Sequence, residues 1–311
     1  MAIIHLGRDD VPPPDLTGGA VTVGNFDGVH RGHRALVAAA RVWADRVGGP
    51  AVAVTFDPPP AALLAPTAAK PPLTTVADRA ALLLSAGADH VAVLRTDPGL
   101  VALSPEAFFE DVILRQFGAR AVVEGYNFRF GRARAGDLGL LRDLCRTHGL
   151  GFEGVNPLVG GDGEPVSSSR VRAALLAGDA AAAADLLGRP YRIAGRVVAG
   201  ARRGRTIGFP TANLDGVETL VPAVGVYAVR AAAAGKFWQA AANVGPNPTF
   251  GEDARKIEVH LIDFAGDLYG QELAVEFVAR LRETKPFAGP AQLVEQLKQD
   301  VAAAKRILAE Q

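Results

Sequence analysis

Short apolar runs alternate with longer helical segments over the first part of the chain. Four runs have the length and composition of buried strands and cover residues 20–24, 51–56, 90–94 and 121–125. Segments with helical spacing of apolar residues follow them and cover residues 31–47, 77–86, 105–116 and 136–147. Strands that alternate with helices predict a parallel sheet covered on both faces. In such sheets ligands bind beyond the carboxyl ends of the strands.

The pattern changes after residues 188–190, which read Gly-Arg-Pro. Strand-like runs joined by Gly- and Pro-bearing turns then cover residues 191–199, 225–231, 237–243, 256–262 and 273–280. These runs predict a small antiparallel β-barrel, and a closing helix is expected to begin near Pro290. The fold class is therefore α/β plus all-β, with a first domain at residues 1–186 and a second at residues 187–311.

Charge and cysteine content narrow the class of protein. The 311 residues hold 33 Lys plus Arg and 33 Asp plus Glu, and this zero balance argues against nucleic acid or a membrane as the main partner. The single cysteine, Cys145, excludes an intrachain disulfide and fits a reducing compartment. The first residues lack the pattern of a signal peptide. We expect a cytoplasmic protein, and a weak homo-oligomer is compatible with the sequence.

The most distinctive early segment, residues 24–33, reads GNFDGVHRGH and leads from a predicted strand into a predicted helix. Its glycines let the backbone turn sharply, and the helix start offers free N–H groups to a phosphate. His30 and His33 are three residues apart and share one helix face. Two imidazoles there could stabilise the transition state of nucleotidyl transfer. The alternative is a Gly-rich turn with two incidental histidines.

A second segment, residues 204–214, reads GRTIGFPTANL. Its Gly-x-x-x-Gly loop with Arg205 could wrap ATP phosphates. Thr211 and Asn213 lie two residues apart in an extended stretch, so their oxygens point the same way and suit Mg²⁺. In the later strand 256–264, Glu258 and His260 share the face opposite the apolar residues. An ordinary turn and an exposed strand glutamate are the alternatives.

These strings resemble the bacterial bifunctional riboflavin kinase/FAD synthetases, whose first domain is a Rossmann-like domain of the HxGH nucleotidylyltransferase superfamily. The resemblance extends to TFDPPP at 55–60, EGYNFRFG at 124–131 and SSSRVR at 167–172. It covers nearly the whole chain in the right order. Two positions depart from the usual family pattern, Pro59 and Pro286.

The resemblance implies a role for each matching residue. In the adenylyltransferase, ATP would contact Gly24, Asn25, Phe26, Asp27, Gly28, His30, Gly32, His33, Asn127, Ser167, Ser168, Ser169 and Arg172. In the kinase, ATP would contact Gly204, Arg205, Gly208, Pro210, Thr211 and Asn213, the last two also holding Mg²⁺. The flavin would contact Phe108, Phe130, Glu258 and Arg282. Glu258 would act as the base of the kinase, and His30 and His33 as the catalytic pair of the adenylyltransferase.

The expected reactions are riboflavin plus ATP to FMN plus ADP, and FMN plus ATP to FAD plus pyrophosphate. Both would need Mg²⁺. One alternative is a related transferase, such as a cytidylyltransferase joined to a barrel. Another is a flavin-binding or regulatory protein that has lost turnover. The pairing of the GFPTAN string with Glu258 argues against the first, and intact His30, His33 and Asn213 argue against the second.

Overall fold

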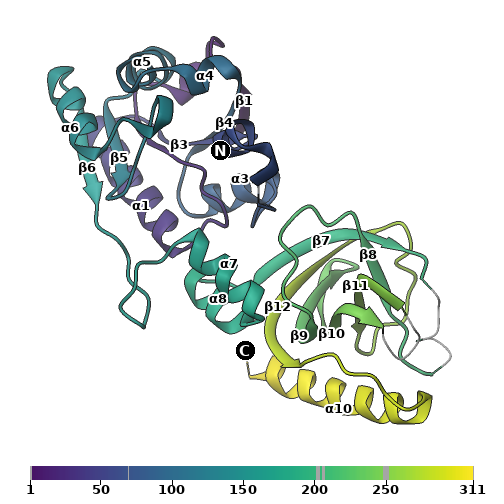
Figure 1. The fold of residues 1–311 in the computed structure, drawn as a ribbon. Helices are drawn as coiled ribbons and strands as arrows, with labels where there is room; N and C mark the ends of the chain where they lie inside the picture. Colours follow the sequence, from purple (N-terminus) through teal and green to yellow (C-terminus); the bar gives the residue numbers. More distant parts are fainter. Residues whose placement is uncertain (1, 69, 201–203, 205–206, 248–251, 311) are drawn as a thin grey trace. The chain divides into compact units, whose positions relative to one another are not determined.

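The chain forms two compact units in a computed structural model that describes residues 2–68, 70–200, 204, 207–247 and 252–310 (Figure 1). Unit one comprises Met1–Lys70 and Thr75–Val166, and unit two comprises Pro71–Thr74 and Ser167–Gln311. Among the residues that the structure describes, no helix combines the length and the apolarity needed to cross a membrane.

Unit one is built on a parallel sheet, which confirms the predicted α/β architecture. Its strands are ordered β1 (Ala2–Leu6), β4 (His90–Arg95), β3 (Ala51–Asp57), β2 (Ala20–Val23), β5 (Ala121–Gly125) and β6 (Gly151–Val155). The four predicted strands are the four central ones, which are buried along nearly their whole length. The two edge strands, β1 and β6, were not predicted.

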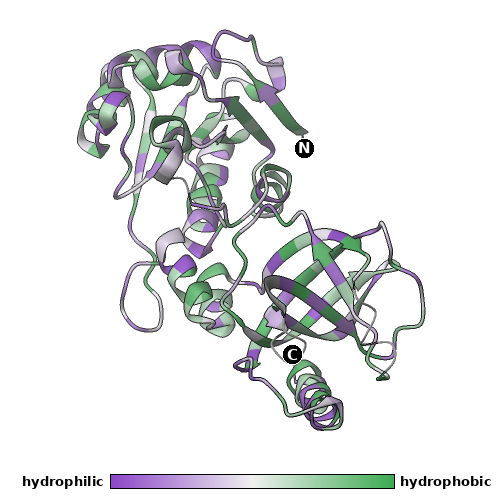
Figure 2. Cartoon of the chain, turned by 45° about the vertical axis from the view of Figure 1, so that its right-hand side comes forward, coloured by the Kyte–Doolittle hydropathy of each residue, from purple (hydrophilic) through white to green (hydrophobic). Residues whose placement is uncertain are grey.

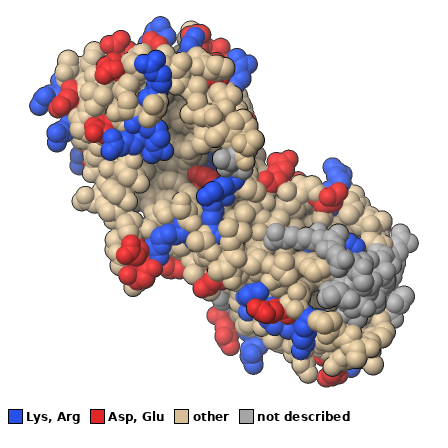
Figure 3. All heavy atoms as spheres, in the orientation of Figure 1, with Lys and Arg blue, Asp and Glu red and all other residues tan. Residues whose placement is uncertain are grey.

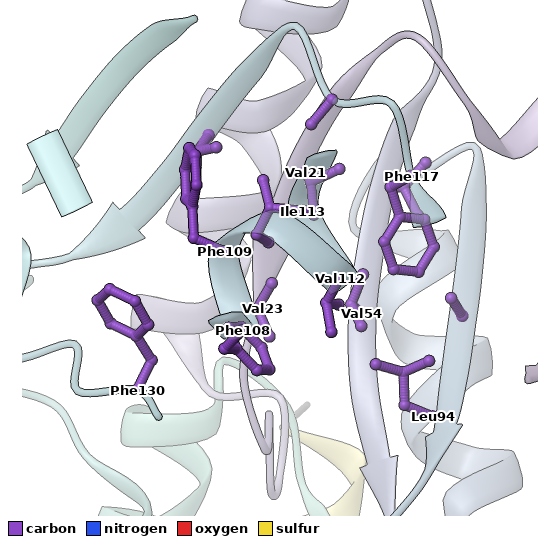
Figure 4. Packing of buried hydrophobic residues seen from close by; sticks show 14 of the residues in the cluster. Val21, Val23, Val54, Leu94, Phe108, Phe109, Val112, Ile113, Phe117 and Phe130 are labelled. Atoms are coloured by element: carbon purple, nitrogen blue, oxygen red, sulfur yellow. The ribbon is translucent and has the colours of Figure 1, made fainter. Parts of the chain in front are cut away.

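Helices cover both faces of this sheet. Helices α1 (Arg31–Val47) and α3 (Val76–Ser85) pack on one face through Val37, Ala80 and Leu83. The other face carries α5 (Pro105–Phe108), its π-helical continuation η3 (Phe109–Gln116), and α6 (Leu138–Thr147). Figure 4 shows the aromatic and branched side chains of this second core around the strands. Shorter segments are η1 (Pro14–Leu16), α2 (Pro60–Leu64), η2 (Pro66–Ala68), α4 (Pro98–Ala102) and η4 (Arg132–Arg134).

The order in which the chain adds strands to the sheet reverses at β2. The chain runs from β2 to β3 and β4 on one side and then crosses to β5 and β6 on the other. Strand β2 pairs with β3 at all four of its residues, whereas its ladder with β5 contains only Ala20↔Ala121 and Val21↔Val122. The two strands therefore stop pairing towards their carboxyl ends. Open α/β sheets bind ligands at this kind of topological switch point.

Unit two contains the predicted antiparallel barrel, closed in the order β10-β11-β8-β7-β12-β9. The strands are β7 (Tyr191–Val198), β8 (Ala212–Asp215), β9 (Gly225–Ala233), β10 (Lys236–Asn247), β11 (Glu252–Leu261) and β12 (Glu272–Arg282). Strand β7 shows the alternation of a barrel wall, with Tyr191, Ile193, Gly195 and Val197 buried and every second residue more exposed. Figure 2 shows the corresponding alternation of hydrophobic and hydrophilic colours on the barrel. The additional strand, β8, begins within the GRTIGFPTANL segment and ends one residue after it.

In the described part of unit two, helices α7 (Ser168–Ala177), α8 (Ala180–Leu187) and α10 (Pro290–Ala309) accompany the barrel. Helices α7 and α8 precede the barrel, and α8 packs on β7 and β12. The predicted domain boundary at residue 187 follows these two helices. The closing helix α10 packs Ala304 and Leu308 against the outside of the barrel.

Candidate active sites

The 24–33 segment begins where β2 ends and is tied to β3. The Gly24 N–H donates to the Val54 carbonyl at 2.9 Å. The Thr55 hydroxyl donates to the Asn25 carbonyl at 3.2 Å. The start of the segment is therefore fixed to the neighbouring strand on one side of the switch point.

The turn that follows holds an unusual backbone. Phe26, Gly28 and Val29 have φ angles of 45°, 82° and 41°. A β-branched residue such as Val29 rarely adopts this left-handed region, and the surrounding structure must hold it there. Phe26 and Val29 are 2% and 1% exposed and pack in the core beneath α1 and α3. This turn delivers His30 to the first position before the helix.

The two histidines stack on each other at the start of α1. His30 is the N-cap residue, and its Nδ1 accepts a hydrogen bond from the His33 N–H at 3.3 Å. The rings lie 3.6 Å apart with an interplanar angle of 18°. Since Nδ1 of His30 acts as an acceptor, the hydrogen of this ring is on Nε2, where it can be donated to a ligand. The cap geometry thus fixes a tautomer suited to a phosphate oxygen.

His33 is held as a neutral ring. Burial lowers the pKa of His33 well below its ordinary value of 6.5, and the neighbouring His30 and Arg79 act in the same direction. The edge of Phe26 lies against the ring, with centroids 5.2 Å apart. A neutral imidazole donates one hydrogen bond without carrying a full charge into the site.

A buried arginine supports the segment from α3. Arg79 is 2% exposed and donates to the Thr55 hydroxyl at 3.2 Å and the Phe56 carbonyl at 3.3 Å. Burial lowers the pKa of Arg79, and the nearby carboxylates of Asp27 and Asp57 act in the opposite direction. Because Thr55 in turn bonds to the 24–33 segment, Arg79 stabilises that segment indirectly.

Across the switch point, the end of β5 supplies Glu124 and Asn127. The Glu124 carboxyl is 1% exposed and accepts from the Val23 N–H at 2.6 Å. Burial raises the pKa of Glu124 well above 4.5, and the bond from Val23 offsets this only in part. Asn127 is exposed in the turn after β5. One buried carboxyl thus links the carboxyl ends of β2 and β5.

The second site lies in unit two and begins with a tight loop. The Gly204 carbonyl accepts from the Phe209 N–H at 2.8 Å. A side chain at Gly204 would place its Cβ 2.3 Å from the Phe209 carbonyl oxygen and 3.4 Å from the Thr211 hydroxyl, so only glycine fits. Gly208 has a φ of 86°, which also favours glycine. Arg205 lies outside the described residues.

Strand pairing brings Glu258 beside Asn213. In the antiparallel ladder of β8 with β11, Glu258 lies directly opposite Asn213, and in the ladder of β10 with β11 it lies opposite Asn243. Directly opposite residues project from the same face of a sheet with Cβ atoms about 4.5–5.5 Å apart. The half-buried Glu258 carboxylate is therefore flanked by two amides on the outer face of the barrel.

His260 fastens the loop to β11. Its Nδ1 lies 2.8 Å from the Pro210 carbonyl oxygen. Its ring meets the Phe209 ring at 5.4 Å and an angle of 62°. These contacts hold the residues before Thr211 against the strand that carries Glu258.

A pocket of about 520 Å³ opens beside this loop. Gly204, Pro210 and Thr211 line it together with residues of β7, β8 and β11 and the turn 264–269, which includes Phe264 and Tyr269. This volume lies in the range typical of small-molecule sites, about 300–1,000 Å³. Three residues predicted to bind ATP thus line one pocket.

The oxygen donors next to this pocket fit Mg²⁺. Thr211 and Asn213 offer neutral oxygens, and Glu258 lies opposite Asn213. No cluster of three or more His, Cys, Asp or Glu side chains suited to a metal occurs in the described part of the chain. A dedicated cage is not what Mg²⁺ requires, because it keeps several waters and shares the phosphates of its substrate.

Comparison with known families matches both parts of the chain. A family described as FAD synthetase matches residues 13–170, and a family described as riboflavin kinase matches residues 187–308. A bifunctional riboflavin kinase/FMN adenylyltransferase from Pseudomonas fluorescens is 40% identical over 95% of this chain and 95% of its own length. The enzyme of the same name from Escherichia coli (strain K12) is 37% identical over 93% of this chain and 92% of its own length.

The chain belongs to the bifunctional riboflavin kinase/FMN adenylyltransferase family. A solved structure titled macrolide-efflux protein, from Streptococcus pneumoniae, has the same fold, with a TM-score of 0.86 and 32% identity. The match covers 97% of this chain and 99% of the solved chain. The family relationship therefore extends over both units.

The start of α7 and the second core of unit one hold further residues that the family pattern implies. Ser167, Ser168, Ser169 and Arg172 lie at the start of α7 in unit two, where the Ser167 hydroxyl caps the helix by accepting from the Arg170 N–H at 3.3 Å. Phe108 and Phe130, predicted to contact the flavin, are 6% and 5% exposed and belong to the core in Figure 4.

Arg282 has another partner. Its guanidinium forms a bidentate ion pair with Asp300 of α10, with N–O distances of 2.7 and 2.9 Å. Asp300 is 4% exposed, so this is a nearly buried pair that ties the closing helix to β12. The predicted flavin contact of Arg282 would have to be made alongside this ion pair.

Glu124, Arg79 and the 264–269 turn were not predicted as parts of a site. A charged residue inside a strand or helix pattern is ordinarily exposed. Nothing local distinguishes Glu124 or Arg79 from that ordinary case. The 264–269 turn reads FAGDLY, and its Gly and Asp are common in strand connections.

Glu124 gives unit one a predictable pH dependence. Because its pKa is raised in the folded state, the folded chain binds the proton more tightly than the unfolded chain. Wild-type stability should then fall as the pH rises above 4.5, the ordinary value of this carboxyl. We expect Glu124→Gln, which keeps an acceptor but cannot ionise, to be the more stable protein at neutral and higher pH.

The test is urea unfolding at a series of pH values in a Trp238→Phe background, where Trp43 reports on unit one. The stability difference between Glu124→Gln and the parent should shrink towards pH 4.5. A difference that stays constant, or that widens as the pH falls, would contradict the buried neutral carboxyl.

Proposed function

We propose that residues 1–186 carry the FMN adenylyltransferase activity and residues 187–311 the riboflavin kinase activity. The kinase converts riboflavin and ATP to FMN and ADP, and the adenylyltransferase converts FMN and ATP to FAD and pyrophosphate. The observation that carries this assignment is the pairing of Glu258 with Asn213 in unit two, separate from the stacked His30 and His33 in unit one.

Adenylyl transfer uses the 24–33 segment. An FMN phosphate oxygen bonds to the α-phosphorus of ATP while the bond to the pyrophosphate breaks. This nucleophile is already ionised at neutral pH, so the protein needs to align it and to stabilise negative charge. His30 supplies an Nε2–H, neutral His33 a second imidazole, and the start of α1 its N–H groups and dipole.

Other residues of the 1–186 segment would complete the predicted nucleotide contacts. Gly24, Asn25, Asp27 and Gly28 precede the histidine pair in the chain, Gly32 lies between the two histidines, and Asn127 is exposed in the turn after β5. Phe26 supports the site from below by packing on His33. The hydroxyls and the guanidinium of Ser167, Ser168, Ser169 and Arg172 would form a charge-assisted phosphate grip.

Phosphoryl transfer uses Glu258. Its carboxylate takes the proton from the 5′-hydroxyl of the ribityl chain as that oxygen bonds to the γ-phosphorus of ATP and ADP leaves. The ATP lies in the pocket lined by Gly204, Pro210 and Thr211, with Gly208 shaping the loop. His260 orients the loop through Pro210 and does not take part in proton transfer.

Mg²⁺ would be held by Thr211 and Asn213 together with the substrate phosphates, and it neutralises their charge when bound. The predicted flavin contacts of Phe108, Phe130 and Arg282 have less support, because the rings are buried and the guanidinium is paired with Asp300. The single cysteine fits a reducing compartment, and we propose the cytoplasm. Cys145 is buried and its pKa is raised to about 12, so it serves no nucleophilic role.

Glu258→Ala should abolish FMN formation from riboflavin while FAD formation from supplied FMN survives. Loss of a general base typically lowers the rate by about 10²–10⁴-fold. Both products are measured by chromatography with Mg-ATP. Glu272→Ala, at an exposed glutamate of β12, is the matched control and should keep both activities. Loss of both activities in folded Glu258→Ala would rule out two separate sites.

The double substitution His30→Ala plus His33→Ala should have the opposite effect. FAD formation from supplied FMN should fall by about 10²-fold or more, because donors to the transition state are lost. FMN formation from riboflavin should remain close to wild type. His148→Ala, at an exposed histidine of unit one, is the control. FAD formation that is unchanged in the double variant would remove the histidines from the proposed mechanism.

A further inference from the structure

The ladder between β2 and β5 ends early on the side where the nucleotide is proposed to bind. The last paired residues are Val21 and Val122, although β2 continues to Val23 and β5 to Gly125. On its other side, β2 remains fully paired with β3. A backbone N–H that is buried at such a point needs another acceptor.

Glu124 provides that acceptor. Its carboxyl oxygen lies 2.6 Å from the Val23 nitrogen, in the direction of the missing ladder bond, and the side chain is 1% exposed. A side chain from β5 thus spans the two strands after they part. Val23 directly precedes the 24–33 segment, and Glu124 directly precedes the turn that carries Asn127.

We infer that Glu124 is a positioning residue for adenylyl transfer, which fixes the start of the 24–33 segment relative to the 125–130 turn. This inference rests on the proposed adenylyltransferase role of these two segments. Glu124 itself needs no contact with the nucleotide. Its action requires an acceptor of the right length, and it does not require a negative charge.

Two substitutions of similar size separate positioning from simple packing. Glu124→Gln keeps an acceptor oxygen for the Val23 N–H, whereas Glu124→Leu fills the space without one. We expect Glu124→Gln to form FAD from FMN at nearly the wild-type kcat. We expect Glu124→Leu to lose about 10- to 100-fold in kcat, because misplacement of aligned groups by about 1 Å is costly. FMN formation should be unchanged in both.

Folding is checked with the single cysteine. Cys145 is buried in the core of unit one, so its reaction with a thiol reagent reports opening of that core. Should Glu124→Leu expose the thiol, Glu124→Met offers the same comparison, being as long as Gln and lacking the acceptor. Glu153→Leu is the control, since Glu153 accepts from the Trp43 indole N–H at 2.6 Å on the edge strand β6. It should leave kcat for FAD unchanged.

The outcomes distinguish this inference from the function on which it rests. Wild-type protein that forms no FAD from FMN would show that the proposed function is wrong. Active wild type with equal kcat for FAD in Glu124→Gln and in the folded Leu or Met variant would overturn the positioning role. A low kcat in Glu124→Gln as well would also overturn it, because the acceptor alone would then not be sufficient.

Discussion

Two parallel strands that separate leave backbone groups without partners, and the architecture of unit one depends on how this is resolved. The order of strand addition reverses at β2, and the carboxyl ends of β2 and β5 are not paired with each other. On the β3 side, the ladder, Thr55 and buried Arg79 hold the 24–33 segment. On the β5 side, the buried carboxyl of Glu124 holds the start of the segment by accepting from the Val23 N–H. The strained turn at Phe26 and Val29 is possible because both sides are fixed.

In the proposed function, the two units handle a triphosphate by different means. Unit one would rely on neutral imidazoles, backbone N–H groups and a helix start, and it would need no base because FMN phosphate is the nucleophile. Unit two would rely on a tight glycine loop and on oxygens beside Glu258, since an alcohol must lose its proton to attack. The difference in the attacking group thus accounts for a carboxylate in one site and its absence in the other.

Acidic and basic side chains are interspersed on the face shown in Figure 3, in line with the zero net charge.

The central strands were predictable because both of their faces are buried, which produces continuous apolar runs in β2, β3, β4 and β5. Strands β1 and β6 are the two edges of the sheet and are only partly buried, so their sequences carry a weaker signal. Strand β8 has four residues, too few to show a period next to a glycine- and proline-rich loop. The start of α1 was predicted at Arg31, where the structure has it.

The site residues divide in the same way. The histidine pair was predictable because its spacing and its helix are local. The position of Glu258 opposite Asn213 depends on barrel register, which joins residues far apart in the chain. Glu124 and Arg79 could not be identified, because their burial follows from tertiary structure alone. Local chemistry can therefore be derived from the sequence, whereas the residues that support it become evident only in the fold.

If two independent sites act in sequence, the product of the first must accumulate before the product of the second in the intact protein. Purified wild type is incubated with riboflavin and Mg-ATP, and the flavins are separated by chromatography at successive times. We expect FMN to rise first and FAD to follow as FMN is consumed. Riboflavin that is bound and recovered unchanged, or a product other than FMN and FAD, would contradict it.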